Sequence, residues 1–290
     1  VNQRYEFKPT VPYVPKDTPV TLLHKVINLD HVSANEVLTF FGVASSFELY
    51  INGEFVGYSE GSHNTAEFNV AQYLQNGENE IICLIYKWCN GTYLECQDMF
   101  RNNGIFRDVY LTHYGATFVR DFSIDPKYLS KGRYELYISA DVVGNLYSLI
   151  YTIKKGDNVL HTITTNNGEK IRYILDNAIE WSAETPELYT LEIQLIDNKG
   201  VAMCFRRDFG LKDVRIRANV LYFNDVAIKF RGVNHHDSNE LHGYYMTVED
   251  YKRDIESMKE YNVNSVRTSH YPPDPIFILM CEHYGIYVVD

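Results

Sequence analysis

From about residue 213 onward, the chain alternates strand-like and helix-like segments joined by short connections. The expected strands are "AIKFRGVNHH" (227–236), "NSVRTSH" (264–270) and "IYVVD" (286–290), and the expected helices are "TVEDYKRDIESMKEYN" (247–262) and "DPIFILMCEHYG" (274–285). A strand–helix–strand order with short connections implies parallel pairing of the strands. Because a closed (β/α)8 barrel needs roughly 250 residues, residues 213–290 predict only the opening third of such a barrel.

Both expected helices carry end signals. Thr247 is suited to cap the first helix, with Asp250 at its third position. Pro275 opens the second helix after the capping residue Asp274, and Gly285 ends it. Apolar residues recur at helical spacing along the first helix, namely Tyr251, Ile255 and Met258.

Residues 1–118 predict a different architecture, built from short antiparallel strands. In "FELYINGEFVGY", Asn52-Gly53 separates two alternating runs. Asn-Gly is a strong hairpin signal because both central residues of a type I′ turn need a positive φ. Further strands are expected in "NGENEIICLIYKW" and "GIFRDVYLTHY". Many short strands with polar turns predict a jelly-roll sandwich.

Residues 119–212 repeat this style without any catalytic pattern. "RYELYISADVV" and "LYSLIYTIKKGDNVL" alternate, and "LYTLEIQLIDNKGVAMCFRRDFG" reads as a hairpin closed at residues 197–200. The size and strand spacing of this region suit a seven-stranded immunoglobulin-like sandwich. We expect it to be a spacer between the jelly roll and the barrel.

Polar side chains follow each predicted barrel strand at its carboxyl end. The first strand ends in residues 234–237, the second in residues 267–270 and the third in Asp290. Functional side chains of β/α barrels gather at the carboxyl ends of the strands, so Arg267 and His270 are predicted to face a shared pocket. The spacing equally allows Arg267 to pair with a neighbouring carboxylate while His270 caps a loop.

Two other patterns are set aside as sites. Adjacent side chains on a strand point to opposite faces, so His235 and His236 do not easily bind one metal ion. Ser269 and His270 do not indicate a hydrolase triad, because sequence neighbours seldom have nucleophile–base geometry and the chain has no Gly-x-Ser-x-Gly motif.

The loop "YLECQDMFRNNGIFRDV" (93–109) gathers charged residues before a strand. Arg101 could form a surface ion pair with Asp98 or Glu95, which would contribute little to stability. The loop could instead extend from the sandwich towards a ligand. Spacing alone does not decide between these interpretations.

Charge and composition exclude several classes of partner. The formal net charge of −11 repels nucleic acid phosphates and anionic lipids, and no apolar run approaches the roughly 20 residues that cross a bilayer. Five cysteines without a Cys-x-x-Cys pattern predict free thiols rather than a zinc or disulfide framework, which favours the cytoplasm. The chain begins at Val1, so we expect its true N-terminus to be missing.

Long stretches of the chain resemble the β-galactosidases of glycoside hydrolase family 2. They are "FELYINGEFVGYSEGSHNTAEFNV", "YLECQDMFRNNGIFRDVYL", "RGVNHHDSNELHG" and "NVNSVRTSHYPPDP…CEHYGIYVVD", with "EWSAETPELYTLEIQL" in the middle region. The resemblance implies a jelly roll, an immunoglobulin-like domain and a catalytic barrel, followed by further β domains. It also implies hydrolysis of terminal β-galactosides with retention, by two glutamates about 5 Å apart.

The resemblance assigns roles to individual residues. His236 and His270 match histidines that line the galactose pocket, and Arg267 matches an arginine beside the nucleophilic glutamate. Asp98 matches a sandwich aspartate that reaches the sugar and a sodium ion. Asn2, in "VNQRYEF", matches an asparagine that contacts the sugar.

The chain departs from the family pattern at one position, and the resemblance implies that further functional residues lie after Asp290. The first barrel strand of the family usually continues Arg-His, whereas this chain has His235-His236, which leaves His235 without a role. Both catalytic glutamates and the magnesium ligands of the family lie beyond the third barrel strand, after Asp290. We therefore expect the full-length parent to be the enzyme, with magnesium and sodium as its ions, and the 290 residues alone to be inactive.

The expected partners are β-galactoside sugars, the remainder of the same polypeptide and further copies in a homo-oligomer. One alternative is a β-glucuronidase or another family 2 hydrolase; a glucuronidase should supply extra cations for the substrate carboxylate, and no basic cluster is seen near His270. The other alternative is a non-catalytic carbohydrate-binding module, in which three barrel strands would serve no purpose.

Overall fold

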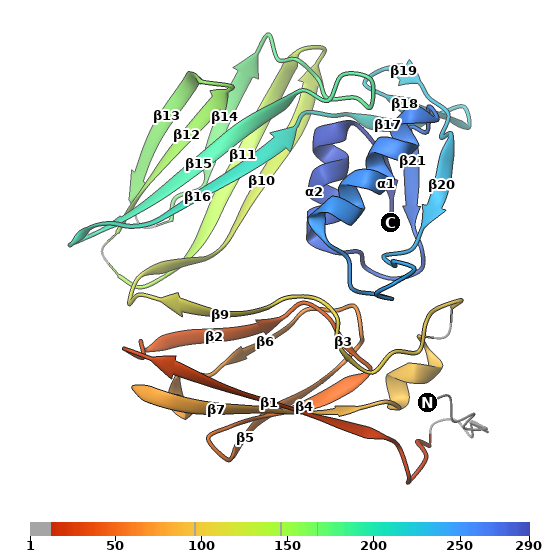
Figure 1. The fold of residues 1–290 in the computed structure, drawn as a ribbon. Helices are drawn as coiled ribbons and strands as arrows, with labels where there is room; N and C mark the ends of the chain where they lie inside the picture. Colours follow the sequence, from red (N-terminus) through yellow and green to blue (C-terminus); the bar gives the residue numbers. More distant parts are fainter. Residues whose placement is uncertain (1–12, 96, 146, 167) are drawn as a thin grey trace. The chain divides into compact units, whose positions relative to one another are not determined.

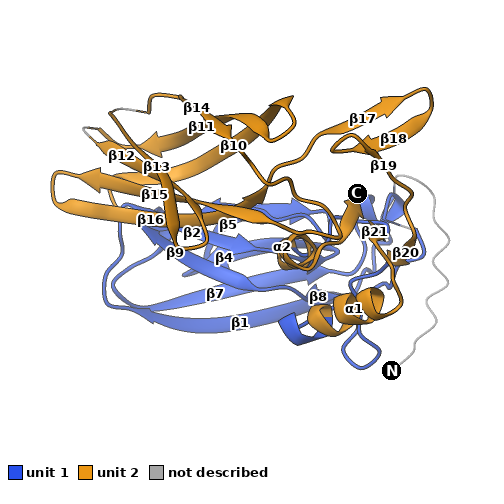
Figure 2. Ribbon diagram, turned by 90° about the horizontal axis from the view of Figure 1, so that it is seen from above, with its two compact units in different colours: residues 1–114, 235–250, 268–274 blue, residues 115–234, 251–267, 275–290 orange. Residues whose placement is uncertain are grey.

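The computed structural model describes residues 13–290 apart from residues 96, 146 and 167, and it is mainly β (Figure 1). Asn2 lies outside the described residues. The described part divides into two compact units that interleave along the sequence (Figure 2). The first unit comprises residues up to 114 together with residues 235–250 and 268–274, and the second comprises residues 115–234, 251–267 and 275–290.

The first unit is built on a β-sandwich. One sheet has the strand order β1-β7-β4-β5, another has the order β6-β2-β9, and β3 pairs with β8. The elements are β1 (Val20–Leu29), β2 (Asn35–Phe40), β3 (Val43–Ala44), β4 (Ser46–Ile51), β5 (Glu54–Glu60), β6 (Ala66–Asn69), η1 (Ala71–Tyr73), β7 (Gly77–Tyr86), η2 (Asn90–Tyr93), β8 (Gly104–Ile105) and β9 (Val109–Tyr114). Phe40, Leu49 and Ile85 come from different strands and are buried in one core.

The Asn-Gly hairpin forms as the sequence predicts. Asn52 and Gly53 have φ values of 51° and 81°, and Ile51 pairs with Glu54 across the turn. The side chain of Asn52 donates to Tyr73 O at 2.8 Å, so the turn is also tied to the sandwich. Positive φ at both central residues is the condition that selects this dipeptide.

The predicted strand "GIFRDVYLTHY" is interrupted. It forms β8 and β9, with residues 106–108 outside both strands. The reason is that Phe106 and Arg107 turn inward: their exposed fractions are 8% and 9%, and Arg107 bonds to carbonyl groups and to a carboxylate instead of lying along a sheet. The interruption therefore accommodates a buried cation.

Seven strands form an immunoglobulin-like sandwich in the second unit. One sheet has the order β10-β11-β14 and the other has the order β13-β12-β15-β16. The strands are β10 (Phe118–Ser130), β11 (Arg133–Val143), β12 (Ser148–Lys155), β13 (Asn158–Asn166), β14 (Ile171–Asp176), β15 (Leu188–Asp197) and β16 (Gly200–Gly210). Leu136, Tyr151 and Ile193 are almost completely buried between the sheets. The hairpin of β15 and β16 closes where the sequence predicts, with Asp197 opposite Gly200.

The segment from residue 214 to the end begins a TIM barrel. The sheet has the order β20-β21-β22, and β21 pairs with β22 in parallel. The elements are β20 (Gly232–His235), α1 (Val248–Glu260), β21 (Ser265–Thr268), α2 (Pro275–Tyr284) and β22 (Tyr287–Val289). A small antiparallel sheet precedes them that the sequence did not predict, formed by β17 (Val214–Arg217), β18 (Val220–Phe223) and β19 (Val226–Ala227). The predicted strand "AIKFRGVNHH" is consequently divided between β19 and β20.

The helix boundaries follow from local chemistry. The Thr247 amide donates to Asp250 Oδ2 at 3.0 Å, and the Asp250 amide donates back to Thr247 Oγ1 at 3.2 Å, which is a capping-box arrangement. Gly285 ends α2 with φ of 75°, and a Cβ at this position would lie 2.4 Å from Ala183 O. Only glycine fits there without strain.

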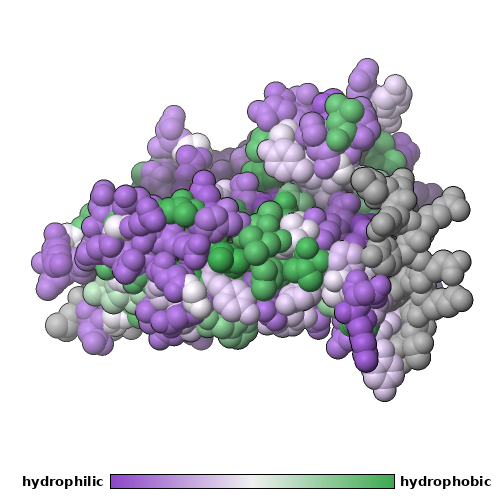
Figure 3. All heavy atoms as spheres, turned by 60° about the horizontal axis from the view of Figure 1, so that its bottom comes forward, coloured by the Kyte–Doolittle hydropathy of each residue, from purple (hydrophilic) through white to green (hydrophobic). Residues whose placement is uncertain are grey.

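The described cysteines are free thiols, as predicted: Cys83, Cys89, Cys204 and Cys281. Cys96 lies outside the described residues. No helix among the described residues is both long and apolar enough to span a membrane. Apolar side chains nevertheless reach the surface: Val20, Leu22 and Val26 are exposed on the edge strand β1, and Figure 3 shows apolar side chains gathered on one face.

Candidate functional site

Two histidines from the ends of neighbouring barrel strands meet in the first unit. His236 follows β20 and His270 follows β21, and their ring centroids lie 5.5 Å apart at an interplanar angle of 82°. Tyr271 Oη lies 3.4 Å from His236 Nδ1. Burial lowers the pKa of His236, and the neighbouring His270 and His235 lower it further, whereas Asp98 and Asp237 act to raise it. This edge therefore presents a neutral imidazole that can both donate and accept hydrogen bonds.

Asp98 comes from the sandwich loop between η2 and β8. It is exposed, its φ is 50°, and its charge acts on His236. The loop is fixed by other residues: Glu95 accepts from the Ser62 amide at 2.6 Å and from the Ser62 hydroxyl at 2.7 Å. Arg101 lies over the Trp88 ring, 5.6 Å from its centroid. The structure thus brings Asp98, His236 and His270 into one compact unit.

The other predicted site residues are placed differently. Arg267 is an exposed residue of β21 and belongs to the second unit, opposite Val289 in the strand register. Its predicted place beside a nucleophilic glutamate stays a prediction. Asn2 lies outside the described residues, so its predicted contact with the sugar also stays a prediction.

A buried ion pair lies behind the histidines, and sequence reasoning missed it. Arg107 Nη2 donates to Asp237 Oδ2 at 3.0 Å, and the two side chains are only 5% and 4% exposed. Burial acts to raise the pKa of Asp237, but the nearby His235 ring, a hydrogen bond from the Asp274 amide and the charge of Arg107 bring it below its usual value. Asp237 is therefore a carboxylate directly beside His236 in the chain. A cation inside the apolar run "GIFRDV" was the available signal.

An aromatic cluster adjoins this pair. His63 stacks on Tyr271 with centroids 3.7 Å apart and an interplanar angle of 16°, and it also contacts Tyr244 and Phe106. Burial and the positive charge of Arg107 lower the pKa of His63 to about 3, against an opposing contribution from Asp237. His63 is thus a neutral ring that packs behind the residue following His270.

His235 and His236 have separate partners. His235 Nδ1 lies 3.6 Å from Asp237 Oδ1, whereas His236 faces His270 and Tyr271. Within the described ranges, no group of three or more His, Cys, Asp or Glu side chains is arranged to hold a metal ion. Asp98 could supply one hard oxygen ligand, which fits at most part of a sodium site.

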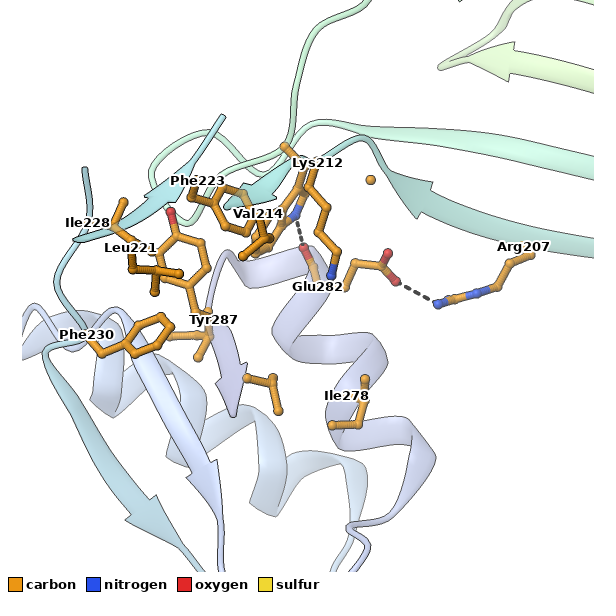
Figure 4. Close-up of a pocket in the computed structure, with 14 residues that line it drawn as sticks. Arg207, Lys212, Val214, Leu221, Phe223, Ile228, Phe230, Ile278, Glu282 and Tyr287 are labelled. Carbon is orange, nitrogen blue, oxygen red and sulfur yellow. Dashed lines mark hydrogen bonds and ion pairs between the residues drawn. The ribbon is translucent and has the colours of Figure 1, made fainter. Parts of the chain in front are cut away.

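An apolar pocket of about 360 Å³ occurs in the second unit and contains none of the predicted site residues (Figure 4). Aromatic side chains line it, among them Trp181, Phe223 and Tyr287. At its edge Arg207 pairs with Glu282 at 3.0 Å. Its lining offers few polar groups that could orient a sugar, so the candidate site is the histidine cluster of the first unit.

Three models of one family together match almost the whole chain. Residues 1–115 match "Glycosyl hydrolases family 2, sugar binding domain", residues 117–212 match "Glycosyl hydrolases family 2", and residues 214–290 match "Glycosyl hydrolases family 2, TIM barrel domain". The chain belongs to glycosyl hydrolase family 2. The family 2 resemblance and the predicted order of sandwich, immunoglobulin-like domain and barrel start are thereby confirmed.

Curated family 2 relatives are named β-galactosidases. The chain is 35% identical to one from Actinobacillus pleuropneumoniae and 37% identical to one from Staphylococcus xylosus, in both cases over its full length. It covers 28% and 29% of those proteins, so it spans less than a third of each relative.

Solved family 2 structures share the fold at lower identity. A Bacteroides uniformis β-glucuronidase superposes with a TM-score of 0.86 at 23% identity, covering 93% of this chain and 36% of that one. A Bifidobacterium dentium β-glucuronidase complexed with coumarin-3-O-glucuronide gives 0.86 at 19% identity, covering 93% and 52%. These likenesses show the fold alone.

Proposed function

We propose that the full polypeptide containing this chain is a retaining β-galactosidase, in which the first unit supplies part of the galactose pocket. The observation that carries the proposal is the edge-to-face contact of His236 with His270 in the unit that also contains Asp98. The 35–37% identity to proteins named β-galactosidase supports the substrate class, because the structural relatives named β-glucuronidase are only 19–23% identical.

In the proposed reaction, this chain binds and orients the sugar. The ring nitrogens of His236 and His270 form hydrogen bonds with the sugar hydroxyls, which fixes the galactose ring in one orientation. Arg267 keeps the nucleophilic carboxylate ionised and oriented through charge-assisted hydrogen bonds. Two glutamates beyond residue 290 carry out the double displacement, one as nucleophile and one as acid and base.

The proposal includes two metal ions, sodium and magnesium, and only sodium is proposed to have a ligand in this chain. Asp98 would contribute one oxygen to a sodium ion that helps to hold the sugar, and the remaining ligands would come from elsewhere. Magnesium ligands are proposed to lie beyond residue 290. The described residues support no complete site for either ion.

The test is hydrolysis of chromogenic substrates by the full polypeptide. We expect a clear preference for β-galactoside over β-glucuronide, and an equal or reversed preference would refute the substrate assignment. His270→Ala and Asp98→Ala should each lower kcat/KM, by about tenfold or more, because each loses a contact to the bound sugar. Unchanged kcat/KM in both variants would remove these residues from the site.

The remaining proposals concern assembly and compartment. We propose a homo-oligomer, to which the exposed apolar side chains on β1 could contribute an interface. We propose the cytoplasm as the compartment, because the described cysteines are free and reduced thiols are maintained there. Sedimentation of the full polypeptide tests the first proposal, and fractionation of the source cells tests the second.

A further inference from the structure

Arg107 makes an unusually complete set of contacts for a cation in a β-sandwich. Besides Asp237, its guanidinium donates to Pro272 O at 2.9 Å, to His63 O at 3.2 Å and to Phe41 O at 3.5 Å. Arg107 Nε also lies 3.9 Å from Asp274 Oδ2. Planar donors in a fixed fork can satisfy several acceptors at once, which a lysine ammonium cannot reproduce.

The acceptors of Arg107 belong to three different segments of the first unit. Phe41 and His63 lie in the sandwich, Asp237 follows β20, and Pro272 follows β21. Asp237 adds a second link, because its Oδ2 also accepts from the Asp274 amide at 2.8 Å. One buried carboxylate and one guanidinium therefore join both post-strand loops to the sandwich.

The joined loops are the ones that carry the candidate sugar contacts. His236 is adjacent to Asp237, and His270 is two residues before Pro272. The Ser269 amide donates to His235 O at 2.9 Å, which links the two loops directly. A displacement of Asp237 is thus transmitted through one peptide unit to His236, and a displacement of Pro272 through two peptide units to His270.

Further contacts hold these loops against the sandwich without involving the ion pair. Tyr244 Oη donates to Phe100 O at 3.1 Å, and Tyr271 stacks on His63. These contacts resist unfolding of the loops when the ion pair alone is removed. The loss of Arg107 is therefore expected to shift the loops rather than to release them.

From these contacts we propose that Arg107, together with Asp237, is a positioning residue that sets the distance and orientation of His236 and His270 for the sugar. The proposal rests on the proposed function, since it concerns the same pocket. It extends that function because Arg107 belongs to the sandwich and contacts no substrate. The sandwich would thus influence how tightly the histidines at the barrel edge bind the sugar.

The experiment measures binding and turnover separately in the full polypeptide. Three variants are assayed with a chromogenic β-galactoside and for inhibition by free galactose: Arg107→Met, Arg107→Lys and Asp237→Asn. The concentration of active sites in each preparation is determined by titration with a covalent inhibitor, and the rates are expressed per active site. We expect the inhibition constant for galactose and KM to rise, and kcat/KM to fall roughly 10–100-fold in Arg107→Met, because a displacement of about 1 Å can cost that much. Arg107→Lys should fall between Arg107→Met and the unaltered protein.

Coupling between the partners is read from the double variant. Combining Arg107→Met with Asp237→Asn should raise the inhibition constant no further than the worse single variant, because both changes break one link. Effects that multiply would show that the two residues act separately and would overturn the proposal.

Leu49→Ala is the matched control. Leu49 is fully buried in the sandwich core and lies outside the joined loops, so this variant loses stability without touching the link. We expect its KM and galactose inhibition constant to stay within about twofold of the unaltered protein at a temperature well below its Tm. If Arg107→Met lowers Tm but leaves both constants unchanged, Arg107 is only structural and the proposal fails.

Two other outcomes are informative. If Arg107→Met does not fold, Arg107→Lys and Asp237→Asn decide the question. Each of these variants leaves one partner of the ion pair unchanged and replaces the other with a side chain of similar size. If the unaltered polypeptide cleaves another glycoside, the proposed function fails. The positioning role is then tested with that glycoside and its free sugar, and it is overturned by unchanged constants.

Discussion

His63 is a buried imidazole enclosed by aromatic rings, and its protonation state has consequences for stability. Its pKa is lowered to about 3 by burial and by Arg107, with Asp237 opposing, from an ordinary value of 6.5. Below pH 6.5 the unfolded chain binds a proton at this residue that the folded protein does not bind. The stability from a neutral His63 is therefore fully present above pH 6.5 and is lost as the pH falls towards 3.

The prediction is that His63→Phe removes this loss. Phenylalanine retains a ring against Tyr271 and has no nitrogen to protonate, so the free energy of unfolding at pH 7 should change by less than about 1.5 kcal/mol. Between pH 6.5 and pH 5 the unaltered protein should lose about 2 kcal/mol of its free energy of unfolding at His63, since each pH unit contributes about 1.4 kcal/mol. The variant should not show this loss. Urea unfolding of the full polypeptide at pH 7 and pH 5 measures both quantities.

His161→Phe supplies the baseline for this comparison. His161 is also stacked on a tyrosine, Tyr173, with centroids 4.4 Å apart, but its side chain is exposed. If the free energy of unfolding falls by the same amount between pH 7 and pH 5 in His63→Phe and in the unaltered protein, the pKa of His63 is not lowered in the folded state and the prediction is wrong.

For individual residues, the sequence indicated which side chains lie at the strand ends. It did not indicate which buried side chains hold those strand ends in place. His270 and the polar run at residues 234–237 could be placed at one edge because the ends of parallel strands share it, and the family resemblance singled out His236. Arg267, predicted to face the same pocket as His270, belongs instead to the second unit. Arg107 and Asp237 could not be paired, because 130 residues separate them and their contact depends on how a sandwich loop meets a barrel loop. His63 gave no signal, because its three aromatic neighbours come from distant parts of the chain.

Among the elements, α1 offers the most direct test of a local sequence signal. The exchange of hydrogen bonds between Thr247 and Asp250 closes its first turn. Thr247→Ala removes the hydroxyl and leaves amides at the helix start without this acceptor, so it should lower the free energy of unfolding by about 1 kcal/mol. Thermal or urea unfolding of the full polypeptide provides the measurement.

Thr247→Ser is the corresponding control, because serine retains the hydroxyl and caps helices at least as well as threonine. It should stay close to the unaltered protein. Equal losses in the alanine and serine variants would indicate that the methyl group of Thr247, rather than the capping hydrogen bond, stabilises this end of α1.

Elements were predictable where their cause is local. The Asn52-Gly53 turn, the β15–β16 hairpin and both helices depend on residues within a few positions of one another. The interruption at residues 106–108 was not predictable, because it follows from a buried ion pair with a partner far along the chain. The β17–β19 sheet was also missed, since its strands are two to four residues long and too short for a clear alternation.

For the whole molecule, the compact units differ from the order of segments along the chain. Residues 235–250 and 268–274 belong by sequence to the barrel, yet they group with the N-terminal sandwich. The sequence could predict the succession of sandwich, immunoglobulin-like domain and barrel start, because each has its own periodicity. It could not predict the interleaving, because that depends on which loops pack against one another.

The chain of 290 residues should bind sugar weakly at most and should hydrolyse nothing. Its candidate site contains histidines and a carboxylate that we propose to orient a substrate, and the nucleophile and proton donor are proposed to lie beyond residue 290. Losing both reacting carboxylates removes the covalent step and its general acid, so turnover of a chromogenic β-galactoside should be indistinguishable from buffer. The full polypeptide, assayed in parallel at the same molar concentration, should turn the substrate over. Turnover by residues 1–290 that His270→Ala abolishes would show instead that a reacting group lies within this chain, and the assignment of the two glutamates to the rest of the polypeptide would be wrong.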